Sequence, residues 1–340
     1  MGGEESSMGW LIAVLGALLV FTAMLAYGLF RKALLRPAAP DPENETALQA
    51  SRWFAYGPIL KPGVKWLKER PWQEERVTAA DGAELRGFRY DGREEKPLLI
   101  LLHDYGSSPW IDFCLTARWA VRQGWSVLLP VERAHGESGG RWCTLGLLEG
   151  EDCLLWIEKA ARQRSADCRV VLGGVGLGAA ALLSAMKQGL PSCVCAVLLD
   201  SAWVSPKEQI RYMVKDRLHM RAFLLLRFLY LMCRLHWGRA PGSLNGTEVL
   251  KENRRVPVFF AQGKQDSMTP YAPVEQAYRD CSAPKRLFTG ENAGHGACCF
   301  IEGERYFTEL EDFLREQLGE RFPLRERTKN PGTKNHGKQP

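Results

Sequence analysis

A glycine-rich segment, residues 173–180, has the spacing of a nucleophile-bearing turn but lacks the nucleophile. An apolar run precedes these residues and a helix-forming run follows them. A strand, a tight turn and a helix with outer glycines at Gly174 and Gly178 would lift a central serine to the end of a sheet, where its hydroxyl can attack a carbonyl group. The central residue here is Gly176, which has no side chain. The segment therefore predicts the frame of an acyl-transfer site without its hydroxyl.

An aspartate and a histidine further along the chain could supply acid–base chemistry. Asp266 follows an apolar run that predicts a strand, so we expect it at the carboxyl edge of the sheet. His295 lies between two glycines in a loop before the last predicted helix, where an imidazole can act as a general base. The alternatives are an aspartate that caps the turn before Pro270 and a surface histidine without a catalytic role.

The combined motifs resemble the α/β-hydrolase superfamily, in particular membrane-anchored serine hydrolases with a serine aminopeptidase-type domain. The resemblance covers roughly residues 60–320 and rests on short motifs in a shared order: Asp81–Gly82, Leu102–His103, residues 133–140, the glycine turn, and residues 200–203, 263–266 and 294–296. It implies a triad with Gly176 at the nucleophile position, Asp266 as the acid and His295 as the base, in the chain order that this superfamily uses.

The resemblance also implies an oxyanion hole formed by two backbone N–H groups, those of Leu177 and Tyr105. The sequence departs from the usual pattern here, because the expected His-Gly pair is His103–Asp104. A carboxylate of Asp104 that points inward would oppose a developing oxyanion, whereas one that points outward would be harmless.

Other polar residues near the predicted site have open roles. Asp200 and Ser201 end another predicted strand, and we expect Asp200 to form structural hydrogen bonds, although it could be a relocated triad acid. Three side chains could in principle replace the missing hydroxyl: Ser201, Cys298 and Ser184. None of them has the geometry of the glycine turn. His135 belongs to a loop that we expect to pack beside the site.

The remaining pattern predicts an α/β fold with a mostly parallel sheet and helices on both faces. Short apolar runs alternate with helix-like segments, as in sheets whose two faces are both covered. The runs are residues 98–102, 125–129, 170–172, 196–199 and 258–261; the helices are residues 110–123, 147–162, 177–187, 271–281 and 304–318, and a hairpin spans residues 75–90. Residues 206–245 form an insertion, with an apolar helix from residue 220 to 237, that we interpret as a small helical cap. An ordinary amphipathic helix packed on the domain is favoured over a membrane-dipping lid.

Residues 10–30 carry no charge and predict a transmembrane helix of about 30 Å. Basic residues follow this stretch and acidic residues precede it, which by the positive-inside rule places the large domain in the cytoplasm. A cleaved signal peptide is the competing interpretation, but the apolar run is longer than such peptides have. We expect a tail at residues 1–9, a linker at residues 31–50, the α/β domain at residues 51–320 and a basic disordered tail at residues 321–340.

Composition excludes several classes of function. Much of the net charge of +6 lies in the last twenty residues, so nucleic-acid binding has little support. The ten cysteines form no CxxC pair, which argues against a disulfide framework and a zinc site. We expect no cofactor and no metal.

The sequence thus predicts a membrane-anchored protein of serine-hydrolase lineage that is catalytically impaired and acts by binding, with a small acyl or peptide group as a possible ligand. The alternative is an active hydrolase of ester or peptide bonds that uses a non-standard nucleophile or a water molecule activated by His295 and Asp266.

Overall fold

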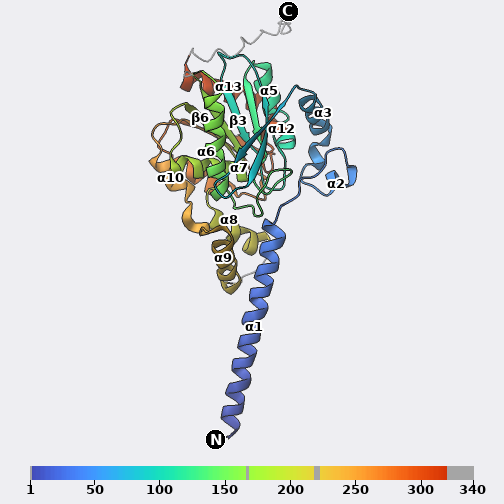
Figure 1. Cartoon of the computed structure of the whole chain (residues 1–340), viewed down its shortest axis with the longest axis vertical. Coiled ribbons are helices and arrows are strands. Elements are labelled where there is room, and N and C mark those ends of the chain that lie inside the picture. The colour runs from blue at the N-terminus through green and yellow to red at the C-terminus, as the bar shows by residue number, and fades with distance from the viewer. Residues whose placement is uncertain (1, 166–167, 218–222, 320–340) are drawn as a thin grey trace, which may run out of the picture.

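An eight-stranded sheet forms the centre of the molecule in the computed structural model, which describes residues 2–165, 168–217 and 223–319 (Figure 1). The predicted tail at residues 321–340 lies outside the described residues. The strands are β1 (Gln73–Thr78), β2 (Glu84–Tyr90), β3 (Leu98–Leu102), β4 (Ser126–Pro130), β5 (Val170–Val175), β6 (Val194–Asp200), β7 (Val258–Gly263) and β8 (Lys285–Gly290). Their order is β1-β2-β4-β3-β5-β6-β7-β8, and all pairs from β4 to β8 are parallel.

The parallel register brings the carboxyl ends of the central strands together. Leu102 at the end of β3 pairs with Gly174 on β5, and Val175 on β5 pairs with Asp200 at the end of β6. The chain passes from β3 to β4 on one side and returns to β5 on the other, which creates a switch point beside β3. Ligands of open parallel sheets bind outside the carboxyl ends at such a point.

Helices cover both faces of the sheet, as predicted for this fold class. Alternate residues of β3 belong to different cores: Ile100 packs with α6, α7, α10 and α11, whereas Leu99 and Leu101 pack with α3, α5, α12 and α13. The bounds of these helices are α3 (Gly57–Lys68), α5 (Thr116–Arg122), α6 (Leu147–Arg162), α7 (Leu177–Gln188), α10 (Gly246–Glu252), α11 (Tyr271–Asp280), α12 (Cys298–Glu302) and α13 (Glu304–Leu318). The fold class is therefore confirmed.

One predicted helix is wrong as a single element. Residues 110–123 form two helices, α4 (Pro109–Asp112) and α5, because the backbone leaves the helical conformation at Phe113, with φ −115° and ψ 14°. The break lets Asp112 accept a hydrogen bond from the backbone of the loop that follows β3.

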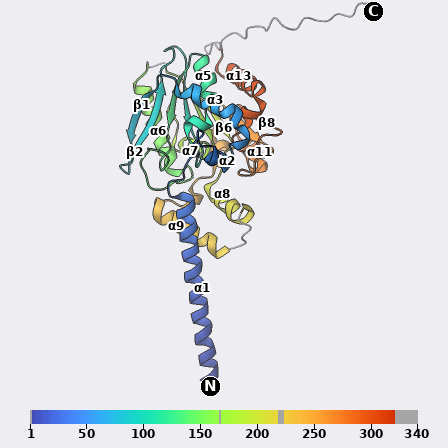
Figure 2. The ribbon, with the colours of Figure 1, turned by 90° about the vertical axis from the view of Figure 1, so that its right-hand side faces the viewer.

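A long helix, α1 (Gly2–Leu34), projects from the domain, and the insertion lies beside its upper part (Figures 1 and 2). The insertion consists of α8 (Pro206–Tyr212), the π-helix η2 (Met213–Arg217), α9 (Phe223–Trp237) and the short η3 (Pro241–Ser243). Within the predicted linker at residues 31–50, α1 continues to its end and α2 (Glu45–Gln49) forms; η1 (Phe54–Tyr56) follows.

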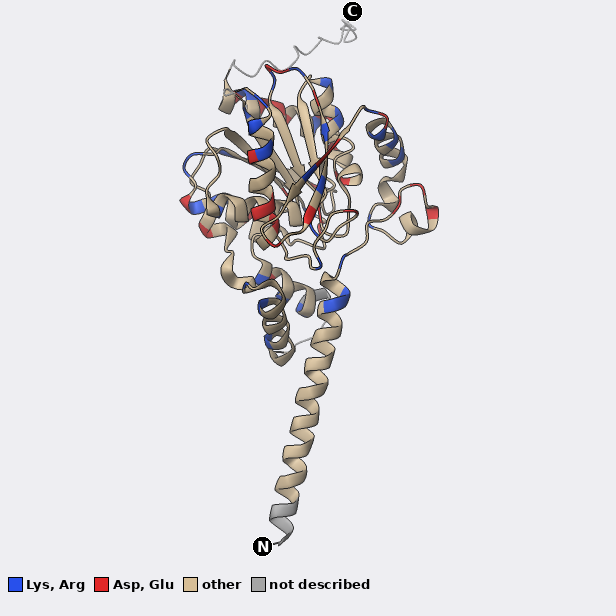
Figure 3. Ribbon diagram, in the orientation of Figure 1, with Lys and Arg blue, Asp and Glu red and all other residues tan. Residues whose placement is uncertain are grey.

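The stretch Ser7–Leu34 of α1 is long enough and apolar enough to cross a membrane. From Ser7 onward α1 carries no charged residue before its last turn, where Arg31 and Lys32 lie, and Figure 3 shows this part of the helix in tan. Length and composition thus agree with the predicted span, and a signal sequence would have the same properties.

Candidate functional site

The glycine turn lies between β5 and α7, at the carboxyl edge of the sheet. Gly176 has φ +49° and ψ −102°, a conformation that residues with a side chain rarely adopt. Gly178 is required by close approach, because a Cβ atom at this position would lie 1.9 Å from the carbonyl oxygen of Leu102. Glycine adopts this conformation without the penalty that a side chain would add, and α7 begins directly after the turn.

The carboxyl group of Asp104 fills the space beside Gly176. A Cβ atom at position 176 would lie 2.0 Å from Asp104 Oδ1 and 2.6 Å from its Cγ, far inside van der Waals contact. The same atom would lie 2.9 Å from Nε2 of His295. The side chain of Asp104, whose direction the sequence left open, thus points inward. Position 176 therefore has no room for a serine.

Asp104 also takes the hydrogen-bond partners that an acyl-transfer intermediate would need. Its Oδ1 accepts a hydrogen bond of 2.8 Å from the backbone N–H of Leu177, the predicted oxyanion donor. Its Oδ2 lies 3.0 Å from Nε2 of His295. One carboxylate therefore occupies both the position of the nucleophile and one donor of the predicted oxyanion hole.

His295 is held between two carboxylates. Its Nδ1 lies 2.8 Å from Oδ2 of Asp266, and its Nε2 faces Asp104. Burial alone would lower the pKa of His295, but the carboxylates of Asp104 and Asp266 outweigh it and raise this pKa to about 9. The ring is therefore protonated at neutral pH and donates a hydrogen bond from each nitrogen, so it cannot accept a proton there.

Asp266 is fixed by the loop that follows β7. Its Oδ1 accepts hydrogen bonds from the backbone N–H groups of Met268 at 2.8 Å and Thr269 at 2.7 Å. Burial opposes ionisation, but His295 and these backbone donors lower the pKa of Asp266 below its ordinary value. The predicted acid and base are thus in contact, with the carboxylate ionised.

Arg52 is a second cation beside Asp104 and was not found from the sequence. Its guanidinium lies 2.7 Å from Oδ2 of Asp104 and over the ring of Trp53 at 4.9 Å. Burial by itself would raise the pKa of Asp104, but Arg52 and His295 together hold it well below its usual range. Two cations therefore face the buried carboxylate of Asp104, and Arg52 also lies 3.8 Å from Asp112. The available signal was an arginine inside the aromatic segment around Trp53.

Asp112 supports the loop that carries Asp104. Its Oδ2 accepts a hydrogen bond of 2.6 Å from the backbone N–H of Asp104, and its Oδ1 accepts one of 2.6 Å from Ser107 Oγ. Burial raises the pKa of Asp112 to about 6, against the opposing effect of Arg52. The arrangement holds the backbone of Asp104 so that its side chain enters the site.

The side chain of Tyr105, the second predicted oxyanion residue, contacts both α1 and Trp203. Its hydroxyl donates a hydrogen bond to the carbonyl oxygen of Ala33 at the end of α1, and its ring lies 6.0 Å from that of Trp203. The loop that follows β3 is therefore tied to the projecting helix.

The two other histidines near the site have structural partners. His103 donates from Nδ1 to the carbonyl oxygen of Asp104 at 2.8 Å and accepts at Nε2 from the N–H of Glu132 at 3.0 Å. Burial, together with the nearby His135, lowers the pKa of His103 to about 3. His135 accepts at Nε2 from the N–H of Gly106 at 3.0 Å. Both rings are neutral loop supports, as the packing role predicted for His135 requires.

The candidate replacements for the missing hydroxyl have other partners. Ser201, with φ +50°, donates from Oγ to Asp200 at 3.0 Å and accepts from the N–H of Gly296 at 2.9 Å. Ser184 donates to the carbonyl oxygen of Leu147, and Cys298 is fully buried with its pKa raised well above the ordinary value by burial. In the hydrogen bonds of the described residues, none of the three contacts His295.

Asp200 lies at the end of β6, beside the site but not against the imidazole. Burial raises the pKa of Asp200 to about 7, and its hydrogen bond with Ser201 opposes that shift. Its contact with Ser201 and through it with the Gly296 backbone fits the structural role expected for it.

No group of three or more His, Cys, Asp or Glu side chains within the described ranges could hold a metal ion. All ten cysteines are free thiols.

Solved structures with the same architecture are esterases and other hydrolases. The Pyrococcus furiosus esterase Pf2001 superposes with a TM-score of 0.58 at 21% identity and covers 75% of this chain and 95% of its own. The α/β hydrolase GrgF from Penicillium sp. sh18 has a TM-score of 0.55 at 18% identity, with 73% and 99% covered. The chain has the α/β-hydrolase fold. A hydrolase from Pseudomonas aeruginosa shares this fold at a TM-score of 0.52 and 20% identity, with 73% and 98% covered.

Two sequence relatives match about three quarters of the chain. The uncharacterized protein YqkD of Bacillus subtilis (strain 168) is 22% identical over 238 residues, which are 70% of this chain and 77% of YqkD. The uncharacterized protein YfhR of Escherichia coli (strain K12) is 24% identical over 270 residues, 76% of this chain and 86% of YfhR. No family model matches the chain.

Proposed function

We propose that this chain is a membrane-anchored pseudo-hydrolase of serine-hydrolase lineage that acts by binding rather than by turnover. The observation that carries the proposal is the carboxylate of Asp104, which lies where the nucleophile of an active relative would stand. With Gly176 at the turn, no hydroxyl is available for acyl transfer, and the Leu177 donor is already used by Asp104.

Burial of the same groups supports impaired catalysis. The side chain of Asp104 is fully buried and that of His295 is 3% exposed, so a scissile bond could not reach the imidazole without displacing Asp104. The ion pairs then have a structural role, because they join the loops that follow β3, β7 and β8.

A cavity beside the site could hold the ligand. It has a volume of about 460 Å³, within the range of small-molecule sites. Its walls come from β2, from the segment after α1 and from the loops after β3 and β4. Phe88, Trp110 and Val131 are its apolar surface, and Arg86, Ser107 and Glu137 are polar. Arg36, which follows α1, donates hydrogen bonds to the carbonyl oxygens of Gly136 and Gly140 on its rim. A small acyl or peptide group fits this mixed lining.

The alternative, hydrolysis by water that His295 and Asp266 activate, is less well supported. A general base must be unprotonated, whereas the pKa of His295 is raised to about 9 and its Nε2 is occupied by Asp104. Activity through this route would appear only above about pH 9, which an ester-hydrolysis profile can detect.

A fluorophosphonate probe tests the impairment. Wild type and Gly176→Ser should both stay unlabelled, because a serine alone collides with Asp104. The double variant Asp104→Gly with Gly176→Ser restores both the hydroxyl and the empty donor at Leu177, and it should be labelled. A labelled wild type would show an active nucleophile and reject the proposal.

The membrane anchor and its orientation are tested in cells. The protein should remain in the membrane fraction after alkaline extraction, at the 38.2 kDa of the uncleaved chain. A smaller soluble product would identify a signal peptide instead. An impermeant maleimide should reach the partly exposed Cys168, Cys193 and Cys195 only after the cells are permeabilised, if the domain is cytoplasmic.

A further inference from the structure

Helix α9 has apolar side chains on two faces, only one of which is covered by protein. Its buried residues recur every four positions and share a core with Ala26 and Phe30 of α1: Leu225, Leu229, Cys233 and Trp237. The other side carries large apolar residues that are exposed, with Phe223 at 70%, Leu231 at 45% and Leu235 at 66%. Exposed apolar side chains gathered on one helix indicate a surface that contacts another apolar phase.

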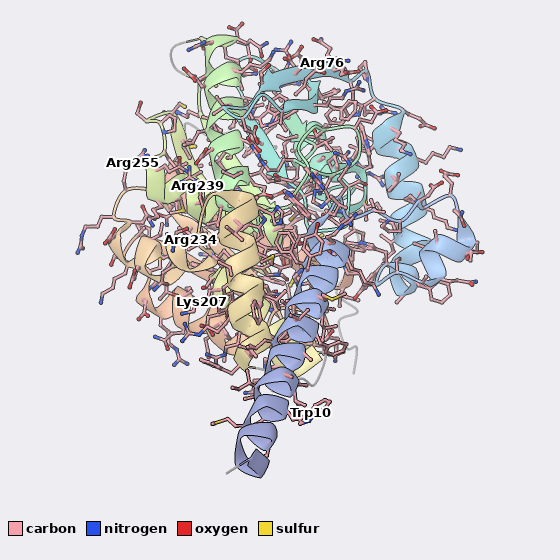
Figure 4. All side chains as sticks on the ribbon, turned by 60° about the horizontal axis from the view of Figure 1, so that its bottom comes forward. Trp10, Arg76, Lys207, Arg234, Arg239 and Arg255 are labelled. Atoms are coloured by element: carbon pink, nitrogen blue, oxygen red, sulfur yellow. The ribbon has the colours of Figure 1, made fainter. Side chains whose placement is uncertain are left out.

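Helix α9 packs along the apolar stretch of α1. The two helices lie side by side at the foot of the domain (Figures 1 and 4). The ring of His236 on α9 stacks on those of Phe30 at 5.1 Å and Tyr27 at 6.2 Å, and Phe30 and Ala26 are buried. The contact therefore lies within the apolar stretch of α1, before its first basic residue at Arg31.

The length of α1 requires the bilayer to reach this contact. Residues 7–21 are exposed along their whole length, and the contact with the rest of the chain begins at Thr22. Fifteen helical residues span only about 22 Å, whereas the hydrocarbon core is about 30 Å thick. A complete span must therefore include part of the segment from Thr22 to Phe30, where α9 lies alongside.

We propose that the exposed face of α9 inserts into the headgroup and acyl boundary of the bilayer that α1 spans, and that its arginines bind anionic phospholipid headgroups. The proposal rests on the proposed membrane anchoring by α1. The cap then contacts a lipid surface, whereas the sequence favoured an amphipathic helix that packs only on the domain.

The charges on α9 fit phosphate groups. Arg227 lies over the ring of Phe223 at 4.8 Å, and Arg234 lies nearly two turns further along, on the exposed side of the helix. Neither arginine forms an ion pair with a described carboxylate. Arginines can extend their charged ends to the headgroups while their stems remain against apolar surface, and amphipathic helices with basic and large apolar residues bind anionic membranes in this way.

The same cap is hydrogen-bonded to the loop of the candidate site. Gln209 of α8 donates from Nε2 to the carbonyl oxygen of Met268 at 3.1 Å, and the hydroxyl of Tyr212 donates to that of Ser267 at 2.9 Å. The docked cap thus holds the loop that carries Asp266 close to the membrane surface.

Lipid photocrosslinking in the full-length protein tests the proposal. Benzoylphenylalanine replaces Leu231 or Leu235 on α9, Leu18 on α1 as a positive control, or Ile59 on α3, which is 46% exposed, as a negative control. The variants are reconstituted in phosphatidylcholine vesicles with and without phosphatidylglycerol, irradiated, and analysed for lipid adducts by mass spectrometry. Adduct yields at positions 231 and 235 should come within about threefold of that at 18 and exceed that at 59 at least about tenfold.

Charge reversal tests the headgroup chemistry. The pair Arg227→Glu and Arg234→Glu should lower the adduct yield at position 235 at least about fivefold in phosphatidylglycerol vesicles, whereas the matched pair Lys251→Glu and Arg254→Glu should not. Adducts at 18 without adducts at 231 and 235 would overturn the docking of α9 and leave the anchor intact. Absence of adducts at 18 as well would overturn both. An unchanged yield in the charge-reversed protein would overturn the anionic partner.

Discussion

The carboxylate of Asp104 and the missing side chain of Gly176 occupy the same space. A Cβ atom at position 176 would lie 2.0 Å from Asp104 Oδ1, so the two positions cannot both carry an inward side chain. The two departures from the hydrolase pattern are therefore one coupled change: glycine at the turn makes room for the aspartate, and the aspartate takes over the contacts with His295 and the Leu177 N–H.

This coupling predicts a steric penalty at position 176 that depends on residue 104. Gly176→Ala should lower the free energy of unfolding by about 2–4 kcal/mol, from overpacking and backbone strain together. The matched control is Gly303→Ala. Gly303 has nearly the same backbone conformation, with φ 47° and ψ −115°, but no atom lies within 4 Å of the added Cβ, so this variant should lose only the free energy that backbone strain costs. Urea unfolding in detergent measures both.

The double variant separates the two contributions. Asp104→Gly removes the atoms that collide with the added methyl group, so Gly176→Ala should cost less in that background. A cost at position 176 that is the same with and without Asp104 would contradict the shared space.

A second prediction concerns the protonation of His295. Its pKa is raised to about 9 by Asp104 and Asp266, against the effect of burial. Asp104→Asn removes one of the two negative charges and should lower this pKa, which NMR titration of the histidine ring protons can follow. The pKa of His135 is lowered chiefly by burial, and Asp104 is only one of its smaller opposing influences, so it should change less than that of His295. If the pKa of His295 is the same in Asp104→Asn as in the wild type, Asp104 does not stabilise the protonated imidazole.

The same shift gives a pH dependence of stability. In the folded protein the pKa of His295 lies above its ordinary value of 6.5. The stability that protonated His295 adds to the fold is therefore complete below about pH 6.5 and is lost as the pH rises through about 9. The shift corresponds to a contribution on the order of 3 kcal/mol. Thermal unfolding from pH 6 to 10 should show this decline in the wild type and a weaker one in Asp104→Asn.

Arg52 supplies a third prediction, since it neutralises a buried carboxylate. Arg52→Gln leaves Asp104 with His295 as its remaining close cation, which should raise the pKa of Asp104. We expect Arg52→Gln to lower the free energy of unfolding by about 1–3 kcal/mol. This is less than the cost of breaking a fully buried ion pair, because the Arg52 side chain is 23% exposed. Arg76→Gln breaks ion pairs of an arginine that is 50% exposed, and it should lower the free energy of unfolding much less than Arg52→Gln does. Equal effects of the two variants would argue against a structural ion pair at the site.

The sequence predicted those parts of the fold and site that depend on local pattern. The run at residues 98–102 and the glycine turn are each readable from a few adjacent residues, because burial on both faces and the close approach at Gly178 demand those residue types. Strand β8 was missed, since Lys285–Gly290 is polar and only partly buried. The inward turn of Asp104 depends on Arg52 and His295, which are distant in the chain, and no local pattern carries that information.

The thiol beside the site gives a last prediction. Cys298 lies only three residues after His295, and a reactive thiolate there would be the simplest substitute for the missing serine. Burial raises its pKa well above the ordinary value, so the thiolate fraction at neutral pH is negligible. Iodoacetamide at pH 7.5 should therefore modify the partly exposed Cys168, Cys193 and Cys195 well before Cys298, as peptide mass mapping over time can show. Fast modification of Cys298 in the folded protein would restore it as a candidate nucleophile and weaken the case for a site without one.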